Sequence, residues 1–190
     1  MTDFTMHTVD TAPEASRPLL EGAKQAFGFI PNLQKVFAES PALLEGYMTL
    51  WGLFEKTSFT PVERHIVYLA INYENRCHYC MAGHSGLAKM AGVSDADVQA
   101  LRDGQPLADP KHEALRQFAA KLVAQRGWLA DEDVQALLSA GYDQRAVLEV
   151  ILGAAVKLMS NYTNHLAQTP VDEPMKAMAW THPDQRLAAE

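Results

Sequence analysis

Both cysteines of the chain lie in one short segment, and its spacing could support redox chemistry. The segment reads Cys77-His78-Tyr79-Cys80-Met81-Ala82-Gly83-His84. Two thiols separated by two residues can close a small disulfide ring, and a histidine four residues past the second cysteine can take its proton. This CxxCxxxH unit therefore points to thiol redox chemistry.

A helical setting would give each residue of the unit a distinct task. On a helix, Cys77, Cys80 and His84 share one face. A helix that begins near Cys77 would favour a thiolate in its first turn, because the unpaired N–H groups and the positive dipole end lie there. Cys80, one turn before His84, is the predicted nucleophile. Cys77, expected to be the more exposed thiol, would resolve a sulfenic acid on Cys80, and an external thiol would restore the dithiol.

Two other interpretations of the cysteine pair remain open. The CxxC could be structural, or Cys77, Cys80 and His84 could bind a metal with His78 or His165 as a fourth ligand. No second ligand pair at the usual spacing is visible, so no metal and no cofactor are predicted. A thioredoxin fold would need alternating strand and helix patterns, which the sequence lacks.

The composition limits the class of protein and its partners. A chain of 190 residues with 48% hydrophobic residues can bury a core, and its formal net charge of -7 argues against nucleic acid and anionic membranes. The start of the chain lacks the pattern of a secretory signal, and the most apolar segment, 147–159, is shorter than a bilayer span. We expect a cytoplasmic protein, where a catalytic CxxC is more common than a structural disulfide.

Almost every segment has the periodicity and composition of a helix, which predicts an all-α fold. Thr60, Pro61 and Glu63 form a capping-box pattern at the start of one helix. We expect a single domain over 1–190, with its core at about 17–170 and irregular ends. Trp180 could hold the last of these ends against the body or against another subunit. The expected helices cover 17–27, 33–37, 42–56, 61–73, 77–90, 95–103, 112–125, 131–139 and 144–165.

Two internal echoes suggest a helical duplication. Residues 95–101 resemble 131–137, and the Asn-Tyr-Glu-Asn at 72–75 resembles the Asn-Tyr-Thr-Asn at 161–164. Asparagines of the second echo, with His165, could line a site from another helix, or they could serve only helix-end hydrogen bonds.

The segment from Glu63-Arg64-His65 through the CxxCxxxH unit resembles the carboxymuconolactone decarboxylase superfamily, and more specifically its alkylhydroperoxidase AhpD-like branch. The likeness covers about residues 41–169. It implies an AhpD-like helical fold, trimers or hexamers, and peroxide reduction by the cysteine pair. It also implies that Cys80 is peroxidatic, that Cys77 resolves, and that His84 relays protons.

One position departs from the pattern of this family, whose relay usually includes a glutamate twelve residues before the first cysteine. Here that position is His65, which could accept a proton or could be an ordinary buried histidine. Glu63 lies roughly 200° around the helix from it, and its capping role explains it without catalysis. Glu74 could supply the missing charge, or it could be a solvated turn residue.

The sequence thus predicts a peroxidase or disulfide reductase that uses a hydroperoxide and a thiol or dithiol donor. Apolar neighbours of the cysteines favour an organic hydroperoxide. One alternative is a lactone enzyme of the decarboxylase branch, whose chemistry needs no CxxC. Another is a non-enzymatic redox-sensing or metal-binding helical module.

Overall fold

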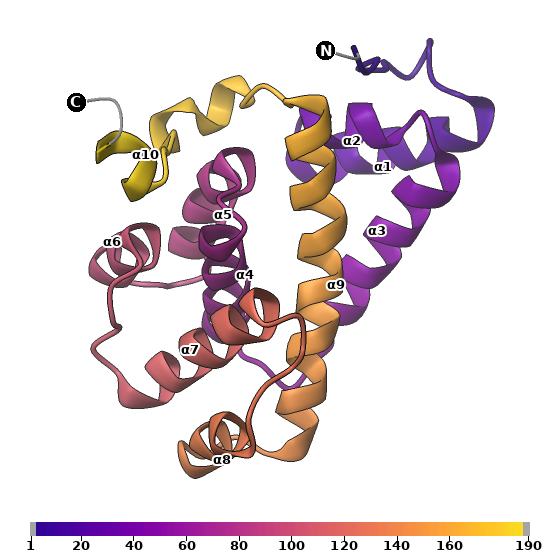
Figure 1. The fold of residues 1–190 in the computed structure, drawn as a ribbon. Coiled ribbons are helices and arrows are strands. Elements are labelled where there is room, and N and C mark those ends of the chain that lie inside the picture. The colour runs from indigo at the N-terminus through magenta and orange to yellow at the C-terminus, as the bar shows by residue number, and fades with distance from the viewer. Residues whose placement is uncertain (1–2, 188–190) are drawn as a thin grey trace.

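A computed structural model describes residues 3–187, and within that range every regular element is a helix (Figure 1). The all-α prediction is confirmed. In chain order the elements are η1 (Glu14–Ser16), α1 (Arg17–Phe27), α2 (Asn32–Phe37), α3 (Pro41–Phe54), α4 (Pro61–Glu74), α5 (His78–Met90), α6 (Asp95–Asp103), α7 (Pro110–Ala124), α8 (Asp131–Ser139), α9 (Gln144–Ala167), η2 (Glu173–Met178) and α10 (Pro183–Leu187).

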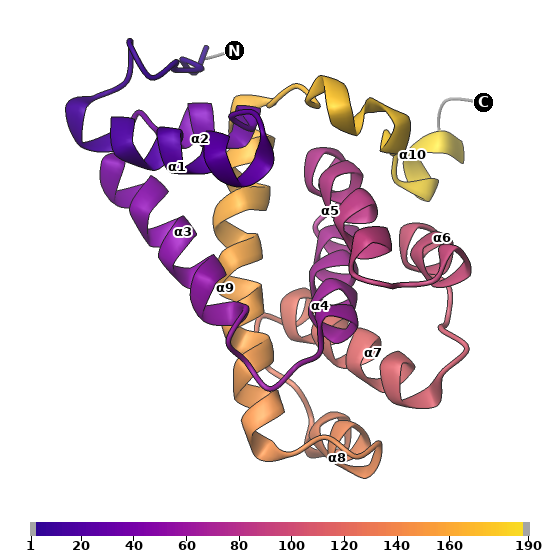
Figure 2. The same cartoon turned by 180° about the vertical axis from the view of Figure 1, so that it is seen from behind.

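The long helix α9 organises the molecule. It runs between the N-terminal helices α1–α3 on one side and α4, α5 and α7 on the other, as both Figure 1 and the reverse view in Figure 2 show. The α4 and α5 helices pack against each other and against α9. The CxxC segment at the start of α5 is therefore enclosed by helices from both halves of the chain.

Local sequence signals set the ends of these helices. The capping box at α4 is present, because the Thr60 side chain accepts from the Glu63 N–H and the Glu63 side chain accepts from the Thr60 N–H. Asp143 caps α9 by accepting from the N–H of Ala146. These caps fix where α4 and α9 begin, and so fix which residues they present to α5.

The tail departs from the expected irregular end. After residue 170 it forms η2 and α10, and Trp180 pins it to the body by donating from Nε1 to the carbonyl of Arg102 at 2.8 Å. Another departure lies at α7, which begins at Pro110 rather than residue 112 because Asp109 accepts from two N–H groups of its first turn.

Within residues 3–187, α9 is the one helix long and apolar enough to cross a membrane by length and composition, with a mean hydropathy of 1.2 over its best window. The apolar segment 147–159 forms the middle of this longer helix. Core helices of soluble proteins pass the same test. Here α9 packs against α3, α4 and α5, and a Cβ on Gly153 would lie 2.8 Å from the Phe54 ring, so it lies close to its neighbours.

Candidate redox site

Both cysteine thiols are buried at the N-terminus of α5. Cys77 is the N-cap residue, and Cys80 lies in the first turn, with 0% and 3% of their surfaces exposed. The expected difference in exposure was wrong, because η2 and α2 cover this end of the helix. Tyr79 connects α5 to both covering segments. Its hydroxyl donates to Asp172 just before η2 and accepts from the N–H of Leu33 in α2.

Asparagines from α9 contact the sulfur atoms. The Asn164 amide donates to Cys80 Sγ at 3.2 Å and lies 4.0 Å from Cys77 Sγ. One turn earlier, Asn161 donates to Asn72 at 3.0 Å and accepts from Asn75 at 2.8 Å. The two echoed segments of the sequence therefore lie side by side beneath the cysteines.

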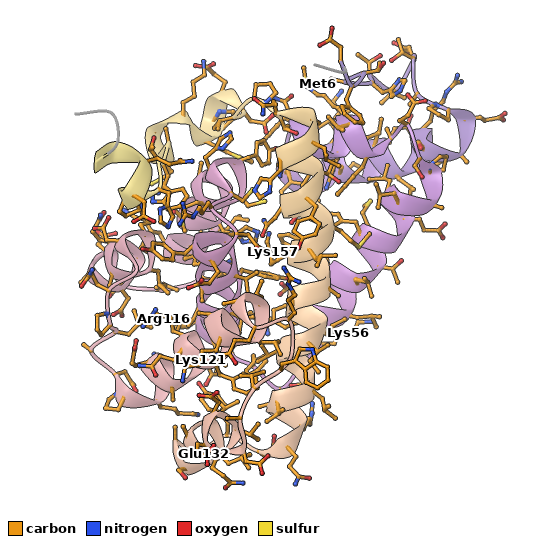
Figure 3. The ribbon with its side chains drawn as sticks, in the orientation of Figure 1. Met6, Lys56, Arg116, Lys121, Glu132 and Lys157 are labelled. Atoms are coloured by element: carbon orange, nitrogen blue, oxygen red, sulfur yellow. The ribbon has the colours of Figure 1, made fainter. Side chains whose placement is uncertain are left out.

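Lys157 is the site residue that the sequence analysis missed. It reaches from α9 toward the α4–α5 pair, as Figure 3 shows, and none of its surface is exposed. Its Nζ lies 2.8 Å from His84 Nε2 and 5.1 Å from the ring centroid of Tyr68. A signal was present in the sequence, since Lys157 is a lone cation in the apolar run 147–159, but a charged residue in such a run usually faces solvent.

The charge of Lys157 bears directly on the thiols. Burial raises the pKa of the Cys80 thiol, but the hydrogen bond from Cys77 and the charge of Lys157 outweigh it and lower that pKa overall. The hydrogen bond to Cys80, together with burial, raises the pKa of Cys77. Cys80 is therefore the thiolate of the pair, which is the form that attacks a peroxide or a disulfide.

His84 is oriented differently from the sequence-based expectation. Its Nε2 contacts Lys157, and no hydrogen bond joins it to Cys80 within residues 3–187. The ring stacks on Trp51 and packs against Tyr68, with centroids 5.4 and 4.7 Å away. Burial, and then the charge of Lys157, lowers the pKa of His84 well below its ordinary value. His84 is consequently neutral at physiological pH, and its Nε2 contacts the amine of Lys157.

His65 joins this cluster from α4. Its ring centroid lies 5.8 Å from that of His84, and its Nδ1 is buried without a hydrogen-bond partner. Burial, followed by the charges of Lys157 and Arg64, lowers the pKa of His65 to about 4. The structure thus places His65 beside His84 as a neutral imidazole, with no fixed negative charge.

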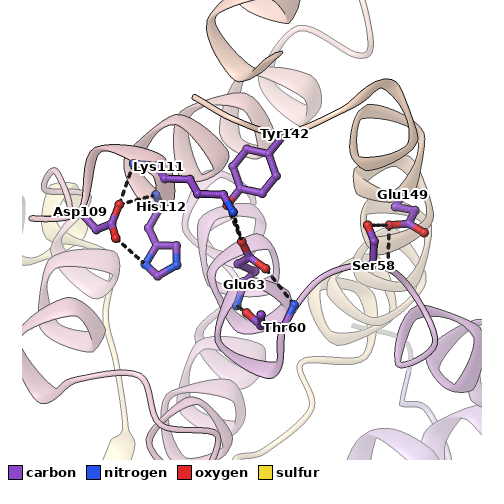
Figure 4. A network of polar contacts seen from close by, with 8 residues as sticks. All are labelled: Ser58, Thr60, Glu63, Asp109, Lys111, His112, Tyr142 and Glu149. Carbon is purple, nitrogen blue, oxygen red and sulfur yellow. Dashed lines mark hydrogen bonds and ion pairs between the residues drawn. The ribbon is translucent and has the colours of Figure 1, made fainter. Parts of the chain in front are cut away.

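Glu63 points away from the cysteines. In Figure 4 its carboxylate closes the capping box with Thr60 and meets two residues of other segments, accepting from the Tyr142 hydroxyl at 2.9 Å and lying 3.3 Å from Lys111 Nζ. These contacts tie the start of α4 to α7 and to the segment before α9. The structural interpretation of Glu63 therefore fits its surroundings.

The other candidates lie at the margin of the site. Glu74 and His78 are exposed, as is His165, which stacks on Tyr162 with centroids 6.4 Å apart. No hydrogen bond or ion pair between Glu74 and the cysteines or His84 occurs in the described chain. Nor do three His, Cys, Asp or Glu residues among 3–187 form a group that could hold a metal ion, so the metal alternative gains no geometric support.

Comparison with known proteins agrees with this architecture. Residues 41–121 match the model of the carboxymuconolactone decarboxylase family. No curated protein sequence matches the chain. The match agrees with the resemblance that the CxxCxxxH segment indicated: residues 41–121 are similar to this family, and the chain has the fold of solved proteins with an alkylhydroperoxidase AhpD core.

Several solved structures share the fold over almost their whole length. An uncharacterized peroxidase-related protein from Ralstonia eutropha JMP134, with an alkylhydroperoxidase AhpD core, superposes with a TM-score of 0.80 at 16% identity, covering 92% of this chain and 96% of its own. A peroxidase-related protein from Silicibacter sp. TM1040 gives 0.78 at 18%, covering 92% of each chain. The debrominase Bmp8 in its apo form gives 0.79 at 20%, covering 94% and 96%. At these low sequence identities, the superpositions show that the fold is shared.

Proposed function

We propose that this protein is a thiol-dependent hydroperoxide reductase in which Cys80 attacks the peroxide and Cys77 resolves the product. The proposal is carried by one observation: Cys80 Sγ is buried beside a resolving thiol, accepts a hydrogen bond from Asn164 and lies in the field of Lys157. Such an environment favours a thiolate while excluding bulk water.

The chemistry balances over two steps. The Cys80 thiolate forms a bond to the terminal oxygen of the hydroperoxide, the O–O bond breaks, and the alkoxide leaves with one proton as an alcohol. The Cys77 thiol then attacks the Cys80 sulfenic acid, the S–S bond forms, and the oxygen leaves as water. Peroxide is reduced by two electrons and the dithiol is oxidised by two. A thiol or dithiol donor restores both cysteines by exchange.

The surroundings of the thiols favour an organic hydroperoxide as substrate. Met81 and Tyr79 are buried on α5 beside the cysteines, and Trp51 covers His84. Apolar side chains interact favourably with an alkyl group and gain little from hydrogen peroxide. A buried dithiol that must return to the reduced form also suits a reducing compartment, so we propose a cytoplasmic location.

The test is peroxide consumption by the reduced protein. We expect one equivalent of cumene hydroperoxide to remove both thiols, and dithiothreitol to support repeated turnover. Cys80→Ser should abolish consumption, whereas Cys77→Ser without added thiol should stop after one turnover with a sulfenic acid, and no disulfide, on Cys80. If one equivalent of peroxide leaves both thiols free, the proposed activity is wrong.

Reductive dehalogenation is a second candidate, and the fold shared with Bmp8 favours it. A solved structure of a cysteine-to-alanine variant of that debrominase holds 2,3,4-tribromopyrrole; it matches this chain with a TM-score of 0.78 at 20% identity. Replacement of a carbon-bound bromine by hydrogen takes two electrons from a dithiol and releases bromide. Incubation of the reduced protein with 2,3,4-tribromopyrrole should release bromide with loss of both thiols if this candidate is right.

Turnover of a lactone that survives Cys77→Ser/Cys80→Ser would instead indicate decarboxylase-type chemistry.

We also propose that the protein is a homo-oligomer, as its family resemblance implies. One face of α9 carries exposed apolar side chains at helical spacing, which favours burial against a second copy. These residues are Leu148, Ile151, Leu158, Tyr162 and Leu166. Light scattering should give a mass of several chains, and Leu158→Lys should lower it. A monomeric mass for the unaltered protein would contradict the proposal.

A further inference from the structure

The amine of Lys157 has an unusual environment for a lysine. It is fully buried, and it takes part in none of the carboxylate ion pairs found among residues 3–187. A buried ammonium without a negative partner is costly, and such a lysine tends to lose its proton. The charged state of Lys157 must therefore depend on something inside the site.

Within residues 3–187, the groups near Lys157 that can supply the missing negative charge are the cysteines. The titratable groups found around Lys157 among residues 3–187 are His65 and Tyr68 of α4, His84 and Cys80 of α5, and Cys77 at its N-cap. Burial raises the pKa of Tyr68 further above neutrality, so it stays uncharged. It also lowers the pKa of both histidines, so they stay neutral as well. Cys80 remains as the group whose deprotonation can balance Lys157.

The pKa shifts within the pair point the same way. Burial lowers the pKa of Lys157, while attraction to Cys80 opposes that shift. The charge of Lys157 in turn lowers the pKa of Cys80. Two low-energy states follow, thiolate with ammonium or thiol with amine, and they differ by the transfer of one proton between neighbouring side chains.

We propose that Lys157 takes the proton of Cys80 and later delivers it to the leaving oxygen of the substrate, with His84 holding the amine in place. This inference rests on the proposed function and names its proton carrier. His84 is then a positioning residue, since its neutral Nε2 contacts the amine at 2.8 Å while its ring is fixed between Trp51 and Tyr68.

The proton balance gives Lys157 a defined cycle. In the reduced protein the Cys80 proton resides on Lys157 as ammonium. When the thiolate forms its bond to oxygen and the O–O bond breaks, the alkoxide takes this proton and Lys157 becomes a neutral amine. Loss of the thiolate removes the charge that held the proton, so the amine stays neutral until donor thiols reduce the disulfide. The Cys77 proton leaves with the second oxygen as water.

The first test uses Lys157→Met, which fills a similar volume without a charge. We expect the variant to fold, because Cys80 can become a neutral thiol and no unpaired charge is left behind. Alkylation of Cys80 by iodoacetamide at neutral pH, measured in a Cys77→Ser background, should slow by about tenfold, the effect of a thiol pKa that rises to about one unit above the assay pH. Lys24→Met, the same change at an exposed position of α1, should leave the rate unaltered. A folded Lys157→Met variant with an unchanged alkylation profile would overturn the proposal.

A second measurement uses the unaltered protein and so does not depend on how a variant folds. Single-turnover oxidation by cumene hydroperoxide in weak buffer with a pH indicator should show almost no net proton uptake, because Lys157 and Cys77 supply both protons. If Lys157 kept its proton as a spectator cation, one proton per turnover would come from solvent, and the inference would be wrong. The two proposals can fail separately, because alkylation of Cys80 needs no peroxide. A failure of the peroxidase assay alone would contradict the proposed function, whereas the alkylation rate of Lys157→Met would still decide whether Lys157 takes the proton of Cys80.

Discussion

The imidazole rings of His65 and His84 lie 5.8 Å apart, and the Nδ1 atom of each is buried without a hydrogen-bond partner. In the AhpD-like proteins that this chain resembles, a glutamate usually occupies the position of His65. Here a neutral imidazole stands at that position, and the amine of Lys157 lies beside His84. Among the described residues of the site, the proposed counter-charge of the Lys157 ammonium is the Cys80 thiolate.

His65→Glu should disturb this balance in a predictable direction. A carboxylate beside His84 would give Lys157 a second negative partner and would repel the Cys80 thiolate, so the pKa of Cys80 should rise. We expect alkylation of Cys80 at neutral pH to slow several-fold and its pH profile to move upward. His65→Gln, which adds no charge, is the matched control and should change the profile little. An unchanged profile in His65→Glu would mean that position 65 does not act on the thiol.

The buried histidines should make the fold sensitive to acid. The folded protein lowers the pKa of His65 to about 4, against an unfolded value near 6.5. Below 6.5 the unfolded chain binds a proton that the folded one does not, so stability falls as pH drops from about 6.5 toward 4. The contribution of His65 over that window is up to about 3 kcal/mol. His84, whose pKa is also lowered by burial, adds to the same loss.

Urea unfolding at a series of pH values between neutrality and the acid limit checks this prediction. The midpoint should fall as the pH is lowered, and His65→Gln should flatten the curve because it removes one titrating group. A midpoint that stays level from neutral pH down to the range of the His65 pKa would contradict the neutral assignment of both rings.

Glu63 should behave as a structural residue despite its place near the family motif. Glu63→Gln weakens the acceptor for the Thr60 N–H and the Tyr142 hydroxyl and removes the ion pair with Lys111. We expect a loss of about 1–3 kcal/mol in the free energy of unfolding, with peroxide turnover per folded molecule unchanged. Thr60→Ala, which removes the other half of the capping box, should cost about 0.5–2 kcal/mol with the same lack of effect on turnover. A selective loss of turnover in Glu63→Gln would assign it a role in the chemistry.

The sequence was sufficient for the parts of the site that depend on local pattern. The helical periodicity and the capping box at Thr60 are properties of neighbouring residues, and both appear in the structure as expected, whereas the expected contact between His84 and Cys80 does not. The echo of 72–75 in 161–164 also had a structural meaning, because Asn72 and Asn161 are hydrogen-bonded.

The parts that could not be predicted depend on contacts between distant helices. Lys157 lies 73 positions from His84 in the chain, and nothing local shows that its face of α9 turns toward α5. The burial of Cys77 depends likewise on Asp172, which is 93 positions from Tyr79. Packing between distant helices therefore determines how exposed the thiols are and which side chain lies near them, and the local sequence pattern does not predict this packing.

The contact between Tyr79 and Asp172 should control access to the thiols separately from their ionisation. Asp172 also accepts from the N–H of Asn32, and Met175 of η2 lies against Gly83, so this one carboxylate joins α2, α5 and the tail. Tyr79→Phe leaves Asp172 and the Leu33 N–H short of a partner, at a cost of about 1–3 kcal/mol to the closed arrangement. Opening the cover should therefore become easier.

We expect Tyr79→Phe to speed alkylation of Cys80 by a similar factor at every pH and to leave the midpoint of the pH profile in place. That outcome would separate a change in access from a change in thiol pKa, which Lys157→Met should produce instead. Tyr162→Phe, at a half-exposed tyrosine of α9, is the matched control and should have no effect on the rate. If Tyr79→Phe moved the midpoint without raising the plateau rate, the hydroxyl would act on the thiolate electrostatically, and the tail would not be the barrier to reagents.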